Sequence, residues 1–198
     1  MSITKFGLIG KNISYSFSKK HFTEKFALGN LDGYVYENFD LQSIEDFPKL
    51  ITENPEIKGL NVTIPYKEEI IPYLNKLSKK AAQIGAVNVI RFTKKGTLKG
   101  YNSDYYGFKK SLQPLLQSHH KKALILGTGG AAKAVAFALN ELGILYTFVS
   151  RDEKEGMIDY NRINATTFDN YHIIINCTPL GTSPNIKDFP LLPYQFFT

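Results

Sequence analysis

The sequence predicts an α/β protein in which strands alternate with helices around mainly parallel sheets. Three observations support this fold class. Short apolar runs of strand length recur between amphipathic segments, the pattern restarts after the polar connector "QSHHKK" at 117–122, and a glycine-rich turn joins the apolar run at 123–127 to a helical pattern. Because strands that alternate with helices usually form parallel sheets, we expect two α/β domains, at 1–102 and 103–198.

The first half of the chain shows both periodicities. In the run "GLNVTIP", Leu60, Val62 and Ile64 fall on one face of a strand, whereas Asn61 and Thr63 fall on the other. Comparable runs predict strands at 3–9, 34–39 and 85–92, and "KKGTLKGYNSD" predicts a hairpin turn with a return strand. Helical spacing predicts helices ending near 28, at 41–51 and at 66–71, the last one after Pro65.

The second half begins with a helix that Ser103 can cap, with Phe108 and Leu112 on its apolar side. Strands are expected at 123–127, 145–150 and 171–178, with a helix at 128–143 between the first two. One βαβ half without its continuation leaves a sheet edge and a hydrophobic face uncovered. The sequence therefore indicates that the C-terminal part of this domain is missing and that the chain is a fragment of a longer one.

Composition narrows the class of partner. The chain has 43% hydrophobic residues and a net charge of +6, but its lysines are scattered and form no arginine-rich run. A small anionic molecule is therefore expected rather than a nucleic acid. The single cysteine, Cys177, and four histidines without ligand spacing predict no metal site. No apolar run has membrane-spanning length and no signal peptide is recognisable, so we expect a cytoplasmic protein, a monomer by default with a homodimer still open.

The turn after the strand at 123–127 carries a nucleotide-binding pattern. Gly127, Gly129 and Ala132 form G-x-G-x-x-A between a strand and a helix, where glycines let backbone amides approach a pyrophosphate. A tight turn that serves packing alone is the alternative. The next strand ends at Ser150-Arg151, where an NAD-binding protein usually has an acidic residue. A guanidinium can pair with a 2′-phosphate, so NADP is expected rather than NAD.

Several polar residues follow predicted strands. Lys67 would lie in a first helical turn, where the helix dipole disfavours a cation, so a reason other than helix stability is indicated. A solvated lysine is the alternative. Ser16 and Ser18 could grip the two oxygens of a carboxylate, although serines in loops are often only turn formers. Asp104 could act in catalysis or simply stabilise the first turn after the Ser103 cap.

The motifs "GLIGKNISYSFS", "NVTIPYK", "GAVN", "YNSDYYGF" and "GTGGAAKA" occur in the order and spacing of the shikimate dehydrogenase family, which the whole chain resembles. The resemblance implies an N-terminal substrate-binding domain and a Rossmann-type NADP-binding domain. It implies reversible NADPH-dependent reduction of 3-dehydroshikimate to shikimate, in the shikimate pathway of aromatic amino-acid biosynthesis. It also assigns roles to individual residues. They are Lys67 and Asp104 as the catalytic pair; Ser16 and Ser18 at the substrate carboxylate; Thr63 and Asn88 at the ring; and Gly127, Gly129, Gly130, Ala131, Ser150 and Arg151 at the cofactor, while Asn61 also falls on a motif position.

The chain departs from the family pattern at a few positions. Tyr15 and Tyr105 replace a common histidine and glycine, which could shift preference towards quinate, and Lys19 replaces a common proline. The family's closing strands and C-terminal helices, with a substrate-binding glutamine, are absent. If the protein ends at Thr198, we expect weak or no activity and poor folding. A quinate/shikimate dehydrogenase and a non-catalytic nucleotide- or shikimate-binding module therefore remain as alternatives.

Overall fold

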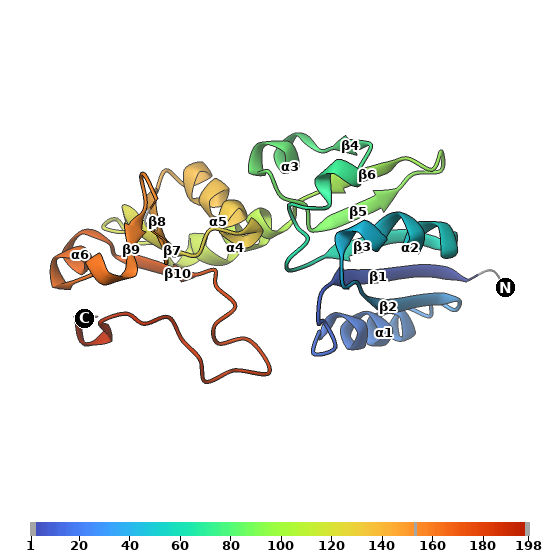
Figure 1. Cartoon of the computed structure of the whole chain (residues 1–198), viewed down its shortest axis with the longest axis horizontal. Helices are drawn as coiled ribbons and strands as arrows, with labels where there is room; N and C mark the ends of the chain where they lie inside the picture. The colour runs from blue at the N-terminus through green and yellow to red at the C-terminus, as the bar shows by residue number, and fades with distance from the viewer. Residues whose placement is uncertain (1–2, 153, 197–198) are drawn as a thin grey trace. The chain divides into compact units, whose positions relative to one another are not determined.

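The computed structural model describes residues 3–152 and 154–196. The chain divides into two compact units, Met1–Ser103 and Asp104–Thr198, each with its own sheet (Figure 1). Both units combine helices with a mixed or parallel sheet, so the predicted α/β class is confirmed.

The sheet of the first unit is mainly parallel at one side and closes with a hairpin at the other. Its strand order is β2-β1-β3-β5-β6-β4. β1 runs parallel to β2 and β3, whereas β5 and β6 are antiparallel to their neighbours in the hairpin, and β4 is parallel to β6. The bounds are Thr4–Gly10 for β1, Tyr34–Asp40 for β2, Ile57–Val62 for β3, Lys76–Leu77 for β4, Val89–Phe92 for β5 and Leu98–Tyr101 for β6.

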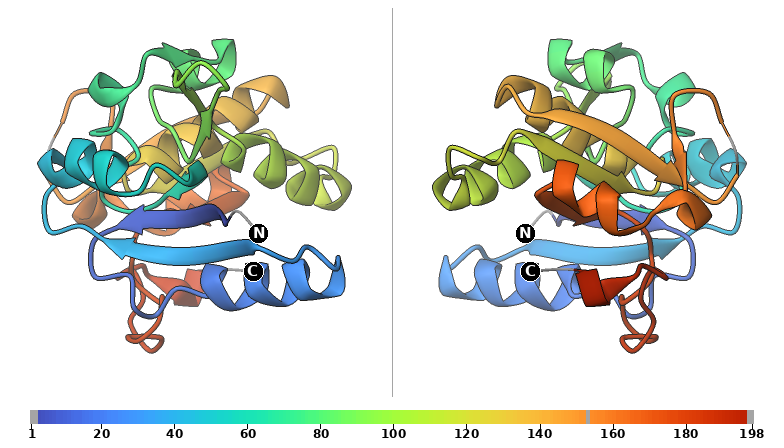
Figure 2. Two further views of the ribbon diagram at one scale, coloured as in Figure 1. Left: turned by 90° about the vertical axis from the view of Figure 1, so that its right-hand side faces the viewer. Right: turned by 90° about the vertical axis from the view of Figure 1, so that its left-hand side faces the viewer.

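Helices cover the two faces of this sheet differently. Helix α1 (Ser18–Leu28) lies alongside β2 and packs Phe22 and Phe26 against the face that carries Leu8 and Tyr36 (Figure 2). Helix α2 (Phe47–Glu53) covers the opposite face together with α3 (Lys79–Ile84) and the short 3-10 helices η1 (Ile44–Asp46) and η2 (Ile71–Tyr73). The alternation of β1, in which Leu8 and Ile9 belong to different clusters, is what separates these two cores.

The prediction of a helix at 66–71 is wrong. This segment forms consecutive turns that lead into η2. The Lys67 carbonyl, which a continuing helix would use itself, accepts a hydrogen bond from the Val87 amide at 2.7 Å. Ile71 donates instead to the Glu68 carbonyl at 3.1 Å, a three-residue spacing. Pairing with a distant segment therefore replaces the regular helix. β3 and β5 are also shorter than their predicted runs, since β3 ends at Val62 and β5 begins only at Val89.

The sheet of the second unit is fully parallel, with strand order β10-β7-β8-β9. Strands β7, β8 and β10 and helix α5 agree with the expected alternation, whereas β9 and α6 were not predicted. The bounds are Lys122–Leu126 for β7, Leu145–Ser150 for β8, Ile158–Asp159 for β9 and Ile173–Asn176 for β10, with helices α4 (Asp104–Leu112), α5 (Gly130–Glu141) and α6 (Ala165–Asn170) and 3-10 helices η3 (Gln113–Leu115), η4 (Tyr160–Arg162) and η5 (Tyr194–Phe196).

Small residues let α5 approach its sheet closely. Ala132, Ala136 and Leu139 pack on the buried strand β7, and α4 packs on α5 with the Tyr105 ring edge-on to Phe137 at 5.2 Å. β10 lies at one edge of this sheet. The chain after β10 runs on as turns and irregular segments, with Phe189 and Leu191 exposed.

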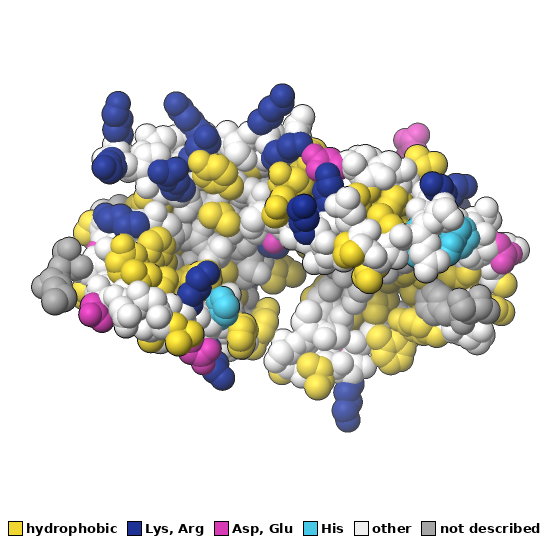
Figure 3. Space-filling model, turned by 180° about the vertical axis from the view of Figure 1, so that it is seen from behind, with side chains coloured by type: hydrophobic (Ala, Val, Ile, Leu, Met, Phe, Trp, Pro, Cys, Tyr) yellow, Lys and Arg dark blue, Asp and Glu magenta, His cyan; other side chains and the backbone are white. Residues whose placement is uncertain are grey.

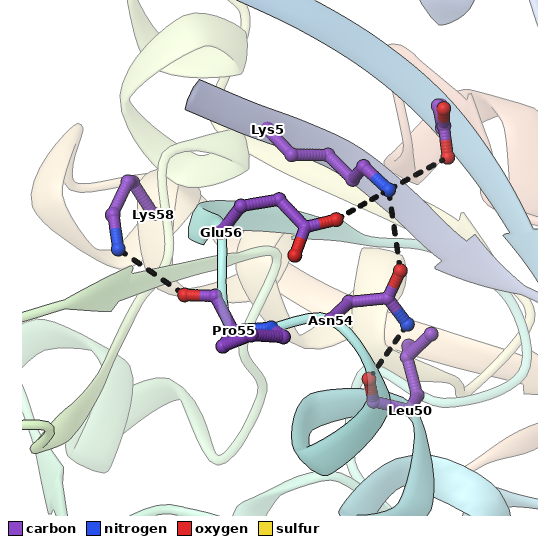
Figure 4. Close-up of polar contacts among 7 residues, drawn as sticks. Lys5, Leu50, Asn54, Pro55, Glu56 and Lys58 are labelled. Carbon is purple, nitrogen blue, oxygen red and sulfur yellow. Dashed lines mark hydrogen bonds and ion pairs between the residues drawn. The ribbon is translucent and has the colours of Figure 1, made fainter. Parts of the chain in front are cut away.

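A partly exposed ion cluster lies at the start of β1 (Figure 4). The Lys5 ammonium lies 2.7 Å from a Glu56 carboxylate oxygen and 3.5 Å from one of Glu37, and it donates to Asn54 Oδ1 at 3.2 Å. The Asn54 amide in turn donates to the Leu50 carbonyl at the end of α2, at 2.9 Å. The hydrogen bond with Glu56 raises the pKa of Lys5 and lowers that of Glu56. The cluster ties β1 to the connection between α2 and β3.

On the face shown in Figure 3, the Lys and Arg side chains stand at several separate positions, interspersed with hydrophobic and uncharged surface. Within residues 3–152 and 154–196, no helix combines the length and the apolar character needed to cross a membrane.

Candidate functional site

One edge of the first sheet gathers most of the predicted substrate residues. It is formed by the carboxyl ends of the parallel strands β1 and β3 and by the start of β5. The Thr63 amide donates to the Ile9 carbonyl at 2.9 Å, and the Lys11 amide donates to the Ile64 carbonyl at 3.2 Å. These bonds hold the loop after β1 beside the turn after β3. Ligands of open α/β sheets bind at such carboxyl ends.

Gly10, the last residue of β1, makes this close approach possible. A Cβ atom at this position would lie 2.5 Å from Thr63 Cγ2 and 2.6 Å from Ile13 Cγ2, well inside van der Waals contact. Ile13 is fully buried, so it cannot move out of the way easily. The glycine therefore allows the loop that follows β1 to pack against Thr63, one of the predicted substrate residues.

The two predicted carboxylate serines lie at the start of α1. Ser16 is half-buried in the preceding turn, with its amide donating to the Ile13 carbonyl at 2.9 Å. Its hydroxyl oxygen accepts a hydrogen bond from the Ser18 amide at 3.2 Å. Ser18 is the first residue of α1 and is half-buried. The Ser16 hydroxyl is thus held by a backbone hydrogen bond of the local fold.

Lys67 and Asn88 are brought together by the backbone. Lys67 is half-buried in the turn after β3, and its carbonyl accepts from the amide of Val87, the residue before Asn88. Asn88 is 9% exposed, and its carbonyl accepts from the Val62 amide at 2.9 Å. The structure thus places Thr63, Lys67 and Asn88 on adjoining segments at one edge of the sheet.

The Asn88 side chain also fixes the end of the first unit. Its Nδ2 donates to Ser103 Oγ at 2.9 Å, and its Oδ1 accepts from the Ser103 amide at 2.8 Å. The Ser103 hydroxyl, predicted as a helix cap, is therefore engaged with Asn88. Asp104 is the next residue and is half-buried as the first residue of α4, in the second unit. Its carboxylate favours the positive end of that helix.

Sequence reasoning missed three polar residues of β2. Tyr36, Asn38 and Asp40 alternate along the strand and so share one face of the sheet. The Tyr36 hydroxyl donates to Asn61 Oδ1 at 2.8 Å, and burial raises the pKa of Tyr36 to about 12. The strict alternation of large polar side chains in "YENFD" is a signal that could have identified this face, since one face of such a strand is normally apolar.

The backbone and its surroundings require glycine at only one of the two glycine positions of the nucleotide-binding pattern. Gly127 has φ +99°, and a Cβ atom there would lie 3.2 Å from the Cys177 carbonyl oxygen, so the fold itself requires it. Gly129 has φ −78° and ψ −173°, which any residue adopts, and a Cβ atom there would meet no atom within 4 Å. Among the described residues no atom would exclude a side chain here, so open space is kept where α5 begins, although Gly129 is also the N-cap of that helix, a position that favours glycine over alanine.

The remaining predicted cofactor residues lie in the first turn of α5 and at the end of β8. Gly130 and Ala131 form the first turn of α5, where unpaired backbone amides favour an anionic group, and Ala131 is exposed. Ser150 ends β8, is 8% exposed and accepts a hydrogen bond from the Asp152 amide at 3.3 Å. Arg151 is exposed, and its charge acts to lower the pKa of Tyr160, although burial raises that pKa by more. The donor set fits a phosphorylated dinucleotide.

Comparison with known proteins decides the family. The model of the shikimate dehydrogenase substrate-binding domain matches residues 8–90. An NADP(+) shikimate dehydrogenase of Clostridium botulinum is 42% identical over 193 residues, which cover 92% of this chain and 73% of the relative. The chain belongs to the shikimate dehydrogenase family. A relative from Methanosphaera stadtmanae, also an NADP(+) shikimate dehydrogenase, is 38% identical over 93% of this chain and 71% of its own length.

Solved structures of the family share this fold. A shikimate dehydrogenase from Peptoclostridium difficile superposes with a TM-score of 0.78 at 35% identity, covering 96% of this chain and 72% of that one. The Thermus thermophilus enzyme in complex with NADP(H) and shikimate gives a TM-score of 0.79 at 29% identity, with 98% and 75% covered. The resemblance first read from five short motifs is therefore confirmed over nearly the whole chain.

Proposed function

We propose that this chain catalyses the reversible, NADPH-dependent reduction of 3-dehydroshikimate to shikimate in aromatic amino-acid biosynthesis. The observation that carries the proposal is its 42% identity, over 92% of its length, to an NADP(+) shikimate dehydrogenase. The gathering of Ser16, Ser18, Thr63, Lys67 and Asn88 at the carboxyl edge of the first sheet supports it, because a small polyhydroxy acid needs a carboxylate site and several hydroxyl partners together.

The substrate would be held by hydrogen bonds of distinct kinds. The hydroxyls of Ser16 and Ser18, two residues apart at the start of α1, suit the two oxygens of a carboxylate. Thr63 and Asn88 offer a hydroxyl and an amide to the ring hydroxyls. Because these groups are set by backbone bonds and by burial, little rotational freedom is lost when the substrate binds.

Lys67 and Asp104 form the proposed catalytic pair. Reduction of a ketone leaves developing negative charge on its oxygen, and an ammonium within hydrogen-bond reach stabilises that charge and can deliver the proton. In the reverse direction the amine accepts the proton from the alcohol. The Asp104 carboxylate favours the charged form of a lysine and can hold the hydroxyl of the substrate. NADPH supplies the hydride when it is bound.

The cofactor would lie on the turn between β7 and α5. Gly129 leaves room for a phosphate, and Gly127 shapes the turn. The backbone amides of Gly130 and Ala131, in the first turn of α5, would donate hydrogen bonds to that phosphate. Arg151, at the end of β8 beside Ser150, suits a 2′-phosphate, which distinguishes NADP from NAD.

The domain assignment follows the same proposal. Residues 1–102 would bind the substrate and residues 103–198 the cofactor, with neither nucleic acid nor membrane as a partner. We propose a cytoplasmic protein, since the pathway's substrates and NADP are small soluble molecules, and a monomer by default, with a homodimer as the alternative.

An assay of NADP reduction with shikimate tests the proposal, repeated with NAD and with quinate. We expect NADP with shikimate to be turned over fastest, and exchanging Arg151 for Ala to raise the KM for NADP more than that for NAD. Exchange of Lys79, an exposed residue of α3, for Ala serves as a charge-matched control. Shikimate and NADP binding without turnover would instead support the non-catalytic binding module, and faster turnover of quinate would support the quinate enzyme.

A further inference from the structure

A carboxylate at the end of β2 holds the loop that leads from β1 to the two predicted substrate serines. Asp40 Oδ1 accepts from the Asn12 amide at 2.8 Å, and Asp40 Oδ2 accepts from the Ile13 amide at 3.2 Å. Asn12 has a positive φ of 55°, a conformation that is costly for most residues. Two successive amides around such a residue form a concave site for an anion. Asp40 supplies that anion from within the chain and so fixes the backbone of the loop.

Asn38, two residues earlier on the same face of β2, binds the carbonyl of the same loop residue. Its Nδ2 donates to the Ile13 carbonyl at 3.4 Å. That carbonyl also accepts from the Ser16 amide at 2.9 Å, which closes the turn that carries Ser16. The Ile13 side chain is 1% exposed and belongs to the core between α1 and the sheet. Asn38 and Asp40 therefore grip both backbone polar groups of a residue whose side chain is already buried.

Asparagine at position 38 contributes little to the stability of the fold. Its one hydrogen bond, to the Ile13 carbonyl, is long at 3.4 Å. Its Oδ1 is buried, and no protein group among the described residues donates a hydrogen bond to it, which is unfavourable. Turning the amide over would set Oδ1 against the Ile13 carbonyl, an acceptor against an acceptor. A leucine of similar size would avoid the buried acceptor, so stability alone does not account for asparagine here.

We infer that Asn38 and Asp40 are positioning residues for the substrate carboxylate. They fix the Ile13 backbone, and the Ile13 carbonyl in turn holds the Ser16 amide. Ser16 Oγ accepts from the Ser18 amide at 3.2 Å, so the Ser16 hydroxyl keeps its proton for an anion. A loop that is held in this way need not be ordered when the substrate binds, which favours affinity. The inference rests on the proposed function, because it takes Ser16 and Ser18 as ligands of the substrate carboxylate.

The charge of Asp40 gives the positioning role a distinctive sign. A carboxylate repels an anionic substrate, so removal of its charge would by itself lower the Kd for shikimate. Loss of the two hydrogen bonds to the loop would raise that Kd instead, because the serines would no longer be held for the substrate. The direction of the change in Kd therefore identifies the role of Asp40.

Binding of shikimate to the full chain, measured by calorimetry, tests the inference. Asp40→Asn keeps the shape of the side chain, but its Nδ2 would face one of the two loop amides, a donor against a donor. We expect the Kd for shikimate to rise about three- to tenfold, as for the loss of one hydrogen bond. The kcat for NADP reduction should stay within about twofold, because Lys67 lies on a different segment, in the turn after β3.

Glu37→Gln is the matched control. It removes one carboxylate from the same strand, but Glu37 lies on the opposite face of β2 and pairs with Lys5 at 3.5 Å. The change in net charge is the same as in Asp40→Asn, and no bond to the loop is lost. We expect a Kd for shikimate within about twofold of that of the unaltered chain.

Asn38→Leu separates positioning from folding. It removes the buried acceptor together with the hydrogen bond to the Ile13 carbonyl. We expect the urea midpoint to stay the same or rise, while the Kd for shikimate rises about two- to fivefold. A residue with a structural role alone would change stability and affinity in the same direction.

Hydrogen exchange of backbone amides reports on the loop without any ligand. In Asp40→Asn the amides of Ile13 and Ser16 should exchange about three- to tenfold faster, because the loop opens more often. The Val62 amide, which donates to the Asn88 carbonyl at 2.9 Å, should keep its rate within about twofold.

Several results would overturn the inference. They are an unchanged or lower Kd in Asp40→Asn, an equal rise in Glu37→Gln, a fall in stability in Asn38→Leu that matches its loss of affinity, or loop amides whose exchange in Asp40→Asn is unaltered. If the unaltered chain binds shikimate and both β2 variants bind it equally well, only this inference fails. If the unaltered chain neither binds nor oxidises shikimate, the proposed function fails with it.

Discussion

The contrast between Gly127 and Gly129 leads to the sharpest prediction about the cofactor site. Both belong to the same turn, yet only Gly127 is required by the chain. For Gly127→Ala, the backbone at φ +99° and a Cβ atom 3.2 Å from the Cys177 carbonyl oxygen add strain. We expect the free energy of unfolding to fall by about 1–3 kcal/mol.

Gly129→Ala should behave in the opposite way. Its backbone suits alanine and the new methyl group would meet open space, but Gly129 is the N-cap of α5, where alanine is less favourable than glycine, so the free energy of unfolding without cofactor should change by no more than about 1 kcal/mol. A bound pyrophosphate would meet that methyl group, and overpacking of this kind costs about 1–3 kcal/mol, which corresponds to a Kd for NADP about 5- to 150-fold higher.

Urea unfolding without cofactor and calorimetric titration with NADP measure both quantities for each variant. The reasoning is refuted if Gly129→Ala binds NADP as tightly as the unaltered chain, because the open space would then not be the pyrophosphate site. It is equally refuted if Gly129→Ala lowers the free energy of unfolding by more than about 1 kcal/mol, since the fold would then need this glycine as well.

Three further predictions concern stability. Gly10→Ala should lower the free energy of unfolding by about 1–3 kcal/mol, because the new methyl group clashes with Thr63 and Ile13. Gly107→Ala, in open space on α4, should raise the free energy of unfolding by about 0.5–1 kcal/mol, and equal urea midpoints of the two variants would contradict this. The raised pKa of Tyr36 means that stability present below about pH 10 is lost as pH rises towards about 12, so unfolding of Tyr36→Phe should depend less on pH there. The lowered pKa of Glu56 means that stability present above its usual pKa of 4.5 is lost as pH falls, and Glu56→Gln should weaken that acid dependence of the unfolding midpoint.

Local patterns predicted the strands and most helices because they reflect nearest-neighbour chemistry. The alternation of Leu60 and Val62 and the alanines of α5 specify burial directly. The segment 66–71 could not be predicted, because its conformation depends on the Val87 amide, which pairs with the Lys67 carbonyl across a long stretch of chain. The spacing of residues within 66–71 gives no information about this hydrogen bond to Val87.

The candidate site was predictable to a similar extent. Motif spacing predicted Ser16, Ser18 and Lys67 as site residues, since each lies in the segment that follows a strand. It could not show that Gly10 must lack a side chain, nor that Tyr36 reaches Asn61, because these contacts join segments separated by many residues. The alternation of polar residues in β2 indicates a polar face, but it does not indicate which residues this face contacts.

The central proposal is that Lys67 acts in catalysis as one member of the pair with Asp104, and comparison of turnover with binding in Lys67→Ala tests it most directly. The account predicts that kcat for NADP reduction with shikimate falls by about 10²- to 10⁴-fold, the usual contribution of a positioned proton donor, while the Kd for shikimate changes only a few-fold. A Lys67→Ala chain that retains turnover, or that loses shikimate binding as completely as turnover, would contradict it.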